Sequence, residues 1–275
     1  MRVSLIFKEK QRPNLGMAYT ANLTNPPLPQ EMEEHTYPIM YQIEGRHWWF
    51  AGRRNIIASF LSALFAGREG AKPSILDVGC GTGANLELLD QYGVAEGVDV
   101  SSDALEFCRQ RGLVRVRQGA AEKLPYENNT FDLVTGLDVV EHLDDDLAGL
   151  REMHRVLKPG GHILLFVPAF MFLWGVQDDI SNHRRRYTLR ELKERVCEAG
   201  FEVERATYAN ITFFTPILLG RILMRITGLR PASENNLTIG ALNKPLGMLL
   251  GAERFWLRNL NLPFGVSAIC LAHRR

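Results

Sequence analysis

Apolar residues follow two alternating periods from Pro73 onward. Short runs rich in β-branched residues alternate with amphipathic segments in which apolar residues recur every three or four positions. The strand candidates are SILDVG (74–79), AEGVDV (95–100), VRVRQG (114–119), FDLVTG (131–136), HILLFVP (162–168) and FEVERATY (201–208). This alternation predicts an α/β fold with a doubly wound, parallel sheet.

The helical segments between these strands carry their own start and stop signals. Ser101 is suited to cap a helix that stops at Gly112. The segment DDDLAGLREMHRVLKPGG has its acids in the first turn and is expected to end at Pro159. Thr188 and Glu191 form a capping box for a further helix.

Two segments precede this alternating region. Residues 1–36 contain TNPPLPQEMEE, which is rich in proline and polar groups, and are predicted to be poorly ordered. Residues 37–72 contain HWWFAGRRNIIASFLSALF, a helical pattern whose aromatic start needs a surface to cover. We therefore expect a helical cap ahead of the sheet.

Composition places few restrictions on partners. The 275 residues suffice for one core with decorations, and 32 Lys+Arg against 31 Asp+Glu give a net charge of +1, which predicts no nucleic-acid partner. The four cysteines lack metal-ligand or disulfide spacing, and Lys8 interrupts the apolar N-terminus, so no secretory signal is predicted. A cytoplasmic location is expected.

The stretch GCGTGA after the first strand places three glycines within five positions. A glycine-rich turn at this point lies at the carboxyl edge of the sheet, where a ligand can touch the backbone and the helix N-terminus. The stretch satisfies the dinucleotide pattern G-x-G-x-x-G/A through Ala84, and equally the tighter G-x-G-x-G through Gly79, Gly81 and Gly83. The glycines alone leave both ligand classes open.

Two acids distinguish these ligand classes in part. Asp99 ends the second strand about 20 residues after the turn, where a carboxylate accepts from the ribose hydroxyls of any adenosine cofactor. Asp77 lies two residues before Gly79, where it would repel a pyrophosphate but suit a cofactor with an ammonium and a sulfonium. The alternative is a structural turn in which Asp77 serves the helix terminus.

Five motifs in this order resemble the class I S-adenosylmethionine-dependent methyltransferases, in the branch that includes the ubiquinone-biosynthesis O-methyltransferases. They are LDVGCGTG, GVDVS, AEKLPYENNTFDLV, LDVVEHLDD and RVLKPGGHILLFVP, between about Pro73 and Phe201. The resemblance implies a Rossmann-like sheet of seven strands whose last strand, FGVSAICLAHR, is antiparallel. The chain then divides into a core over residues 73–208, a helical insertion over 209–262 that covers the acceptor site, and a closing strand over 263–275.

The resemblance also implies a cofactor, S-adenosyl-L-methionine, with S-adenosyl-L-homocysteine as the product. The residues that it places around this cofactor are Asp77, Gly79, Cys80, Gly81, Gly83, Asp99, Val100, Ala121, Glu122, Leu137 and Asp138. One position departs from the pattern. Ala120 stands where many relatives have an aspartate that accepts from the adenine amino group, so Gln118 or a backbone carbonyl would have to substitute.

Histidines near the carboxyl edge are the candidate general bases, because a hydroxyl or amine acceptor must lose a proton. His142 follows the fourth strand and His183 follows the fifth. The segment DVVEHL, with Asp138, Glu141 and His142, resembles a divalent-metal motif of the ubiquinone O-methyltransferases. The same residues occur in relatives that need no metal, where they orient the following helix. We therefore assign no metal site from the sequence.

The loop GVQDDISNHRRRYT lies where this fold receives its acceptor. It is either a solvated turn or a binding loop in which Arg184 to Arg186 clamp an anionic acceptor beside His183. HWWF is either core or a lid over the cleft. The candidate acceptor-binding residues are Trp48, Trp49, Asp178, Arg185, Arg186 and Tyr187.

The segment ITFFTPILLGRILMRITGLRP is apolar for nearly the length of a membrane span. Arg221 and Arg225 interrupt it on one helical face, which disfavours spanning. It is expected to cover the core or the acceptor pocket, and the alternative is peripheral contact of residues 211–230 with the inner face of a membrane.

These observations predict a methyltransferase that acts on a small-molecule or lipid-linked acceptor of natural-product, quinone or glycan type, more often at oxygen than at nitrogen or carbon. The alternatives are a nicotinamide-dependent oxidoreductase, which Asp77 and the LKPGG segment disfavour, and a cofactor-binding scaffold without activity.

Overall fold

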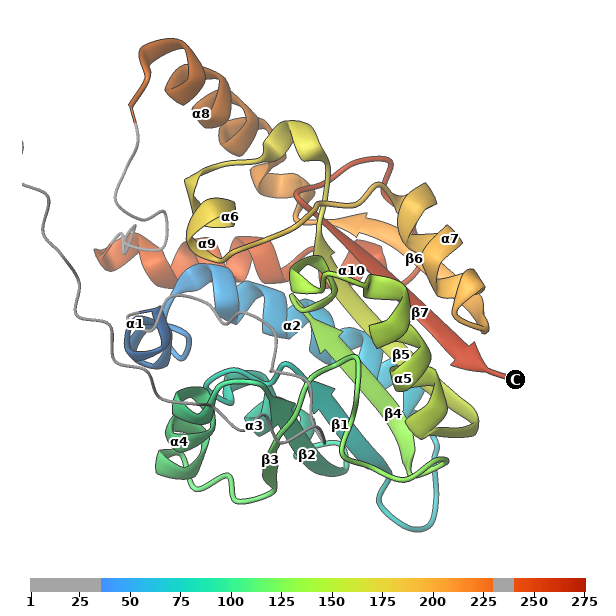
Figure 1. The fold of residues 1–275 in the computed structure, drawn as a ribbon. Coiled ribbons are helices and arrows are strands. Elements are labelled where there is room, and N and C mark those ends of the chain that lie inside the picture. Colours follow the sequence, from blue (N-terminus) through green and yellow to red (C-terminus); the bar gives the residue numbers. More distant parts are fainter. Residues whose placement is uncertain (1–35, 230–239) are drawn as a thin grey trace, which may run out of the picture.

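The computed structural model describes residues 36–229 and 240–275. The segment predicted to be poorly ordered, residues 1–36, therefore lies outside the described residues apart from Thr36. The described part is a central sheet flanked by helices on both faces, with helical additions at one edge (Figure 1).

The sheet has seven strands in the order β3-β2-β1-β4-β5-β7-β6, and β7 is antiparallel to both of its neighbours. The strands are β1 Ser74–Val78, β2 Val94–Asp99, β3 Val116–Gln118, β4 Phe131–Leu137, β5 Leu157–Pro168, β6 Phe201–Ala209 and β7 Ser267–Arg274. All six strands predicted from the apolar pattern are present. The Rossmann-like fold with a closing antiparallel strand is confirmed.

The helices begin before the sheet and continue between and after its strands. The α-helices are α1 Thr36–Ile43, α2 Trp48–Leu64, α3 Ala84–Leu89, α4 Ser102–Gln110, α5 Asp146–Val156, α6 Val176–Ile180, α7 Leu189–Glu198, α8 Phe214–Thr227, α9 Asn243–Gly251 and α10 Arg254–Leu257. Short 3₁₀ helices are η1 Val140–His142, η2 Met171–Leu173, η3 Ile211–Phe213 and η4 Gly240–Leu242.

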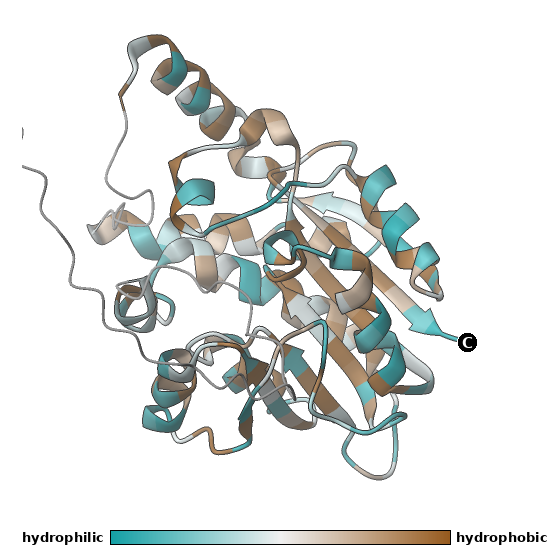
Figure 2. Ribbon diagram, in the orientation of Figure 1, coloured by the Kyte–Doolittle hydropathy of each residue, from teal (hydrophilic) through white to brown (hydrophobic). Residues whose placement is uncertain are grey.

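Two apolar cores lie on opposite faces of the sheet. One joins buried strand residues to α5 and α7, and the other joins them to α2, α3, α4 and α10. Leu76 contributes to the first core and its neighbour Ile75 to the second, as the alternation of side chains along a strand requires. Figure 2 shows the result as hydrophobic central strands behind helices with hydrophilic outer faces.

Local signals explain where most elements start. The Ser101 hydroxyl accepts from Ala104 N at the start of α4, and Thr188 with Glu191 forms the predicted capping box of α7. The helix expected to end at Pro159 ends earlier, at Val156. Leu157 already pairs with Phe131, and a bulge separates this pair from Leu133 and His162, so KPGG protrudes from β5 rather than closing the helix.

The additions after β6 pack on the cap before β1. Helix α9 lies against α2, and glycines permit the close approach: a Cβ at Gly52 would lie 2.7 Å from the Leu250 Cβ. Asn243 Oδ1 accepts from Trp48 N at 2.8 Å and so ties α9 to the first turn of α2. Across the described residues, no helix is long and apolar enough to cross a membrane.

Candidate active site

A cavity of about 760 Å³ lies at the carboxyl ends of the central strands. Its wall includes the glycine turn after β1, the end of β2, the loop after β3, the end of β4 with η1, the loop after β5, the start of β7, and the helices α1, α2, α8 and α9. This is the edge at which ligands bind in open α/β sheets.

The glycine turn forms one end of the cavity. Gly79, Gly81 and Gly83 all have positive φ, of 66°, 52° and 88°. A Cβ at Gly79 would lie 2.0 Å from Val139 Cγ2, whereas no atom lies within 4 Å of a Cβ at Gly81, which lines the cavity. Gly79 is therefore required by packing, while Gly81 keeps open the space beside the backbone.

Asp99 holds the turn and faces the cavity. One of its carboxylate oxygens accepts from Gly81 N at 2.8 Å, and the other accepts from Ser101 N at 3.0 Å. A carboxylate oxygen has two lone pairs, so a hydrogen bond to the backbone is compatible with a second one from a ligand hydroxyl. The predicted role of Asp99 at the ribose fits this position and stays a prediction.

Asp77 lies behind the turn rather than in it. It is buried, accepts from the Thr135 hydroxyl at 2.6 Å, and is not among the residues that line the cavity. Burial, opposed by the Thr135 hydrogen bond and reinforced by Asp99, raises the pKa of Asp77 to about 7. Its position does not support the direct contact with a cofactor ammonium predicted from the sequence.

The other predicted cofactor residues fall into two groups. Cys80, Val100, Ala121, Glu122, Leu137 and Asp138 line the cavity, whereas Gly83 does not. The hydrogen bond between Cys80 and Cys108, together with burial, raises the pKa of the Cys80 thiol, so it is not a thiolate nucleophile. Asp138 has a positive φ of 60° and binds Arg53 at 2.6 Å.

The cap supplies a wall that sequence reasoning only partly found. Trp48 and Trp49 line the cavity as the lid hypothesis requires. Glu44, which the sequence did not single out, is buried, lines the cavity and accepts from the Thr82 hydroxyl in the glycine turn. Arg53 was also missed, although it follows Trp49 by one helical turn and its guanidinium lies 4.1 Å from the centre of the Phe166 ring.

The loop after β5 builds a charged cluster around Asp178. This fully buried carboxylate accepts from His183 Nδ1 at 2.8 Å, from two nitrogens of Arg186 and from Gly175 N. Burial raises the pKa of Asp178, but the hydrogen bonds from His183 and Arg186 outweigh it and lower the value to about 2. The ionised Asp178 can only accept, so His183 Nδ1 donates to it, and Nε2 is the ring nitrogen that does not face Asp178.

Three predicted acceptor-binding residues lie away from the cavity wall. Asp178 is buried beneath His183, Arg185 binds Asp146 and backbone carbonyls, and the Tyr187 hydroxyl donates to Asp146 at 2.8 Å. Only Arg186 of the predicted arginine clamp lines the cavity, and its guanidinium is bound by Asp178. These positions support a structural role for the loop rather than a clamp on an anion.

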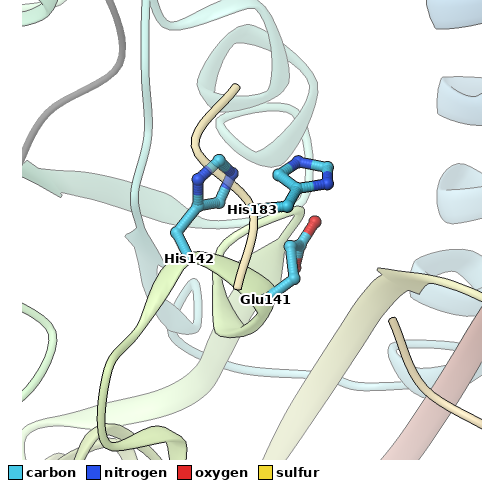
Figure 3. A group of neighbouring side chains, drawn as sticks. All are labelled: Glu141, His142 and His183. Carbon is cyan, nitrogen blue, oxygen red and sulfur yellow. The ribbon is translucent and has the colours of Figure 1, made fainter. Parts of the chain in front are cut away.

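The two candidate bases meet at the cavity wall. The rings of His142 and His183 are 4.6 Å apart between centroids and nearly perpendicular. Burial and the neighbouring His183 lower the pKa of His142 to about 4, so this imidazole is neutral at pH 7. Figure 3 shows both rings with Glu141, whose burial and proximity to Asp138 raise its pKa well above the usual range.

Helix α8 closes the opposite side. One face of it, with Phe213 before it, lines the cavity through Pro216, Ile217, Gly220, Arg221 and Met224. Arg221 is buried, and the lack of a side chain at Gly175 makes room for its guanidinium. The burial of Arg221 agrees with the core or pocket-cover interpretation of this segment, and its role over the acceptor site stays a prediction.

Comparison with known proteins identifies the domain. Residues 76–165 match the family described as a methyltransferase domain. A Mycolicibacterium smegmatis protein named "Probable S-adenosylmethionine-dependent methyltransferase" is 32% identical over 175 residues, which are 62% of this chain and 65% of that protein. A demethylmenaquinone methyltransferase of Symbiobacterium thermophilum is 33% identical over 50% of this chain and 61% of its own length. The matches thus span less than two thirds of these relatives.

A solved structure supports the fold. An S-adenosylmethionine-dependent methyltransferase of Thermotoga maritima superposes with a TM-score of 0.53, at 17% identity, over 88% of this chain and 100% of its own. At this identity the likeness concerns the fold alone. The domain match, the relatives and the seven-stranded sheet agree with one another: residues 76–165 form a methyltransferase domain, and the chain is similar to S-adenosylmethionine-dependent methyltransferases over the matched part.

Proposed function

We propose that this protein transfers a methyl group from S-adenosylmethionine to an oxygen of a small-molecule or lipid-linked acceptor. The observation that carries the proposal is a single cavity whose wall includes both the glycine turn with Asp99 and the histidine pair. Its volume of about 760 Å³ lies toward the upper end of small-molecule sites, which span about 300–1,000 Å³. That volume supports simultaneous binding of a cofactor and an acceptor.

The chemistry follows from the placement of His183. The acceptor oxygen attacks the methyl carbon, the bond from that carbon to the sulfonium sulfur breaks, and S-adenosylhomocysteine leaves. The acceptor proton passes to His183 Nε2, because Nδ1 already donates to Asp178. Asp178 acts as a positioning residue: it fixes the tautomer and stabilises the imidazolium that forms. His142, neutral and partly buried, packs against this ring.

The lining indicates the acceptor's character. Apolar and aromatic side chains dominate the side opposite the glycine turn, including Trp48, Phe213, Ile217 and Leu246. Such a surface favours an acceptor with a hydrocarbon or aromatic body over a strongly charged one. An oxygen acceptor suits the cavity because a hydroxyl must lose its proton and a base lies beside the acceptor side.

A lipid-linked acceptor would be reached from a membrane surface, and we assign this contact to residues 211–230. The face of α8 away from the cavity exposes Leu219, Leu223 and Ile226, by 59%, 58% and 78%. The insertion over residues 209–262 also carries six basic and two acidic residues in a chain of net charge +1. An apolar helical face with local positive charge suits an anionic bilayer.

Vesicle sedimentation tests this contact. Leu223→Glu should reduce binding to phosphatidylglycerol vesicles, because it places a charge on the inserting face. Val114→Glu is the matched control, since Val114 is 78% exposed on a different part of the surface. Equal binding by both variants would remove the membrane from the proposal.

Titration calorimetry tests the function itself. S-adenosylmethionine and S-adenosylhomocysteine should bind with micromolar affinity, and nicotinamide dinucleotides should not. Tighter binding of a nicotinamide cofactor would overturn the assignment. Binding of S-adenosylmethionine, followed by transfer of a labelled methyl group to lipid extracts or phenolic compounds, would then locate the acceptor class.

A further inference from the structure

Three metal-ligating side chains converge at the wall of the cavity. Glu141 and His142 come from η1 after β4, and His183 comes from the loop after β5. The loop is fixed beside η1 because Arg184 N donates to Glu141 O at 2.8 Å. One potential ligand atom from each residue lies within 4.8 Å of those from the other two, and Figure 3 shows the Glu141 carboxylate directed toward the His183 ring.

In the part of the chain that the structure describes, Glu141 lacks a hydrogen-bond partner, and the charges of Arg53 and Arg186 only partly offset its burial. Its side chain is fully buried, and neither carboxylate oxygen has a hydrogen-bond partner among the described residues. A buried carboxylate without hydrogen bonds is costly, because its lost hydration is not replaced. Two other fully buried acids are well satisfied: Asp178 accepts four hydrogen bonds, and Glu253 accepts two from backbone amides.

Both imidazoles are already oriented from behind. His183 Nδ1 is held by the Asp178 carboxylate, and a ring nitrogen of His142 is hydrogen-bonded to the backbone of Ser181. A carboxylate or a backbone group on the far nitrogen is the arrangement that orients histidine ligands in metal sites. One nitrogen of each ring is left for a cation beside Glu141.

We propose that Glu141, His142 and His183 bind one divalent cation of the zinc type. Two imidazole nitrogens and one carboxylate oxygen suit Zn²⁺ or Co²⁺ better than Mg²⁺ or Ca²⁺, which prefer oxygen ligands. Asp138, the carboxylate of the motif noted in the sequence, is not part of the site, because it is bound to Arg53. The third ligand is instead His183, which lies about 40 residues further along the chain.

The site has three protein ligands, and two of them line the cavity. Three ligands leave a fourth position for water or substrate, as in catalytic zinc sites. A hydroxyl of the acceptor bound at that position would lose its proton to water through coordination. His183 Nε2 would then be a ligand, so a bound cation replaces the imidazole base described above.

Cation binding can be measured without cofactor or acceptor. The test of the metal site therefore does not depend on whether the protein transfers a methyl group. Chelator-treated protein is titrated with Co²⁺ and its visible absorption is followed, and Zn²⁺ is titrated by calorimetry. We expect one ion per chain and a visible spectrum typical of a four- or five-coordinate site. Titration without saturation at one equivalent would overturn the proposal.

Variants show whether the cation binds at this site or at other histidines of the chain. Glu141→Gln and His183→Asn should each weaken Zn²⁺ binding by more than about 100-fold, since even partners behind the ligands contribute about 10–100-fold. Asp178→Asn should cost about 10–100-fold. His162→Asn is the matched control, because His162 belongs to a second histidine pair that shares Glu204 with His273. Loss of the ion in His162→Asn, or its retention in Glu141→Gln, would contradict the assignment.

Folding of each variant is checked independently. For Glu141→Gln and His183→Asn, thermal unfolding without metal and the affinity for S-adenosylmethionine should both stay near those of the unaltered chain, because none of the three ligands belongs to the glycine turn. Asp178→Asn also loses its ion pair with Arg186, so its metal affinity is compared only after its folded fraction has been measured. If Glu141→Gln does not fold, metal binding is tested with His183→Asn instead. His183 is only partly buried, so its replacement should disturb the fold less than replacement of the buried Glu141.

Discussion

The two halves of the cavity are built in different ways. The half that we propose for the cofactor is built around one β-α-β unit, and backbone amides hold it: Gly79 N and Cys80 N donate to Val98 O, and Gly81 N donates to the Asp99 carboxylate. The acceptor half joins η1, the loop after β5 and α8, and side chains hold it. Asp178 binds Arg186, and Arg225 binds the carbonyls of Phe172 and Trp174.

This difference teaches which changes each half tolerates. Backbone hydrogen bonds do not depend on the side chain, so the cofactor half is sensitive mainly to residues that need glycine or carry a charge. The acceptor half depends on a few buried polar side chains, each of which leaves a partner unsatisfied when it is removed. Substitutions in the two halves should therefore separate cofactor affinity from turnover and stability.

The largest effect is expected at the glycine turn. Gly81→Leu should abolish measurable binding of S-adenosylmethionine, because the side chain would fill the open space beside a backbone with φ of 52°. Gly112→Leu is the control, since Gly112 has a similar φ of 82° and open surroundings but does not line the cavity. Calorimetry should show intact binding in the control. Micromolar binding by Gly81→Leu would show that the turn is not the cofactor site.

A smaller effect, confined to chemistry, is expected in the other half. His183→Ala should lower turnover by about 100-fold or more while leaving affinity for S-adenosylmethionine unchanged, because a positioned base or metal ligand contributes at least that much. His154→Ala serves as the control, since His154 packs on Phe201 away from the cavity. Near-full turnover by His183→Ala across the pH range would remove His183 from the reaction.

The same difference explains what the sequence could predict. The glycine turn, Asp99 and the strands are encoded locally, so the apolar period and the spacing of the motif were enough to place them. Glu44 carries no local signal, because its place in the cavity wall depends on how the cap packs on the sheet, and the helical face of Arg221 did not say which side would face the cavity. The KPGG bulge was missed because proline and glycine after a helix usually end it without continuing into a strand.

The loop after β5 shows the limit most clearly. HRRRY suggested an anion clamp, yet Arg185 and Arg186 are bound by Asp146 and Asp178 of the protein itself. Sequence gives the charges but not their partners, and the acids that pair with these arginines lie in different segments. Only the fold shows whether such charges are available to a ligand or are already paired with acids of the protein.

The smallest expected effect tests this internal pairing through stability. The pKa of Asp178 is lowered to about 2 in the folded chain against about 3.9 in an unfolded one. A lowered pKa stabilises the fold above the unfolded value, and this contribution is lost as the pH falls toward about 2. Asp178→Asn should therefore be destabilised relative to the unaltered chain at pH 7, and the gap in free energy of unfolding should shrink by about 1 kcal/mol at pH 3.

Urea unfolding at the two pH values measures this gap, with Asp103→Asn, at an exposed position, as control. A gap that does not change with pH would mean that Asp178 is not the ionised partner of His183 and Arg186, and the acceptor half would then need another explanation for its geometry.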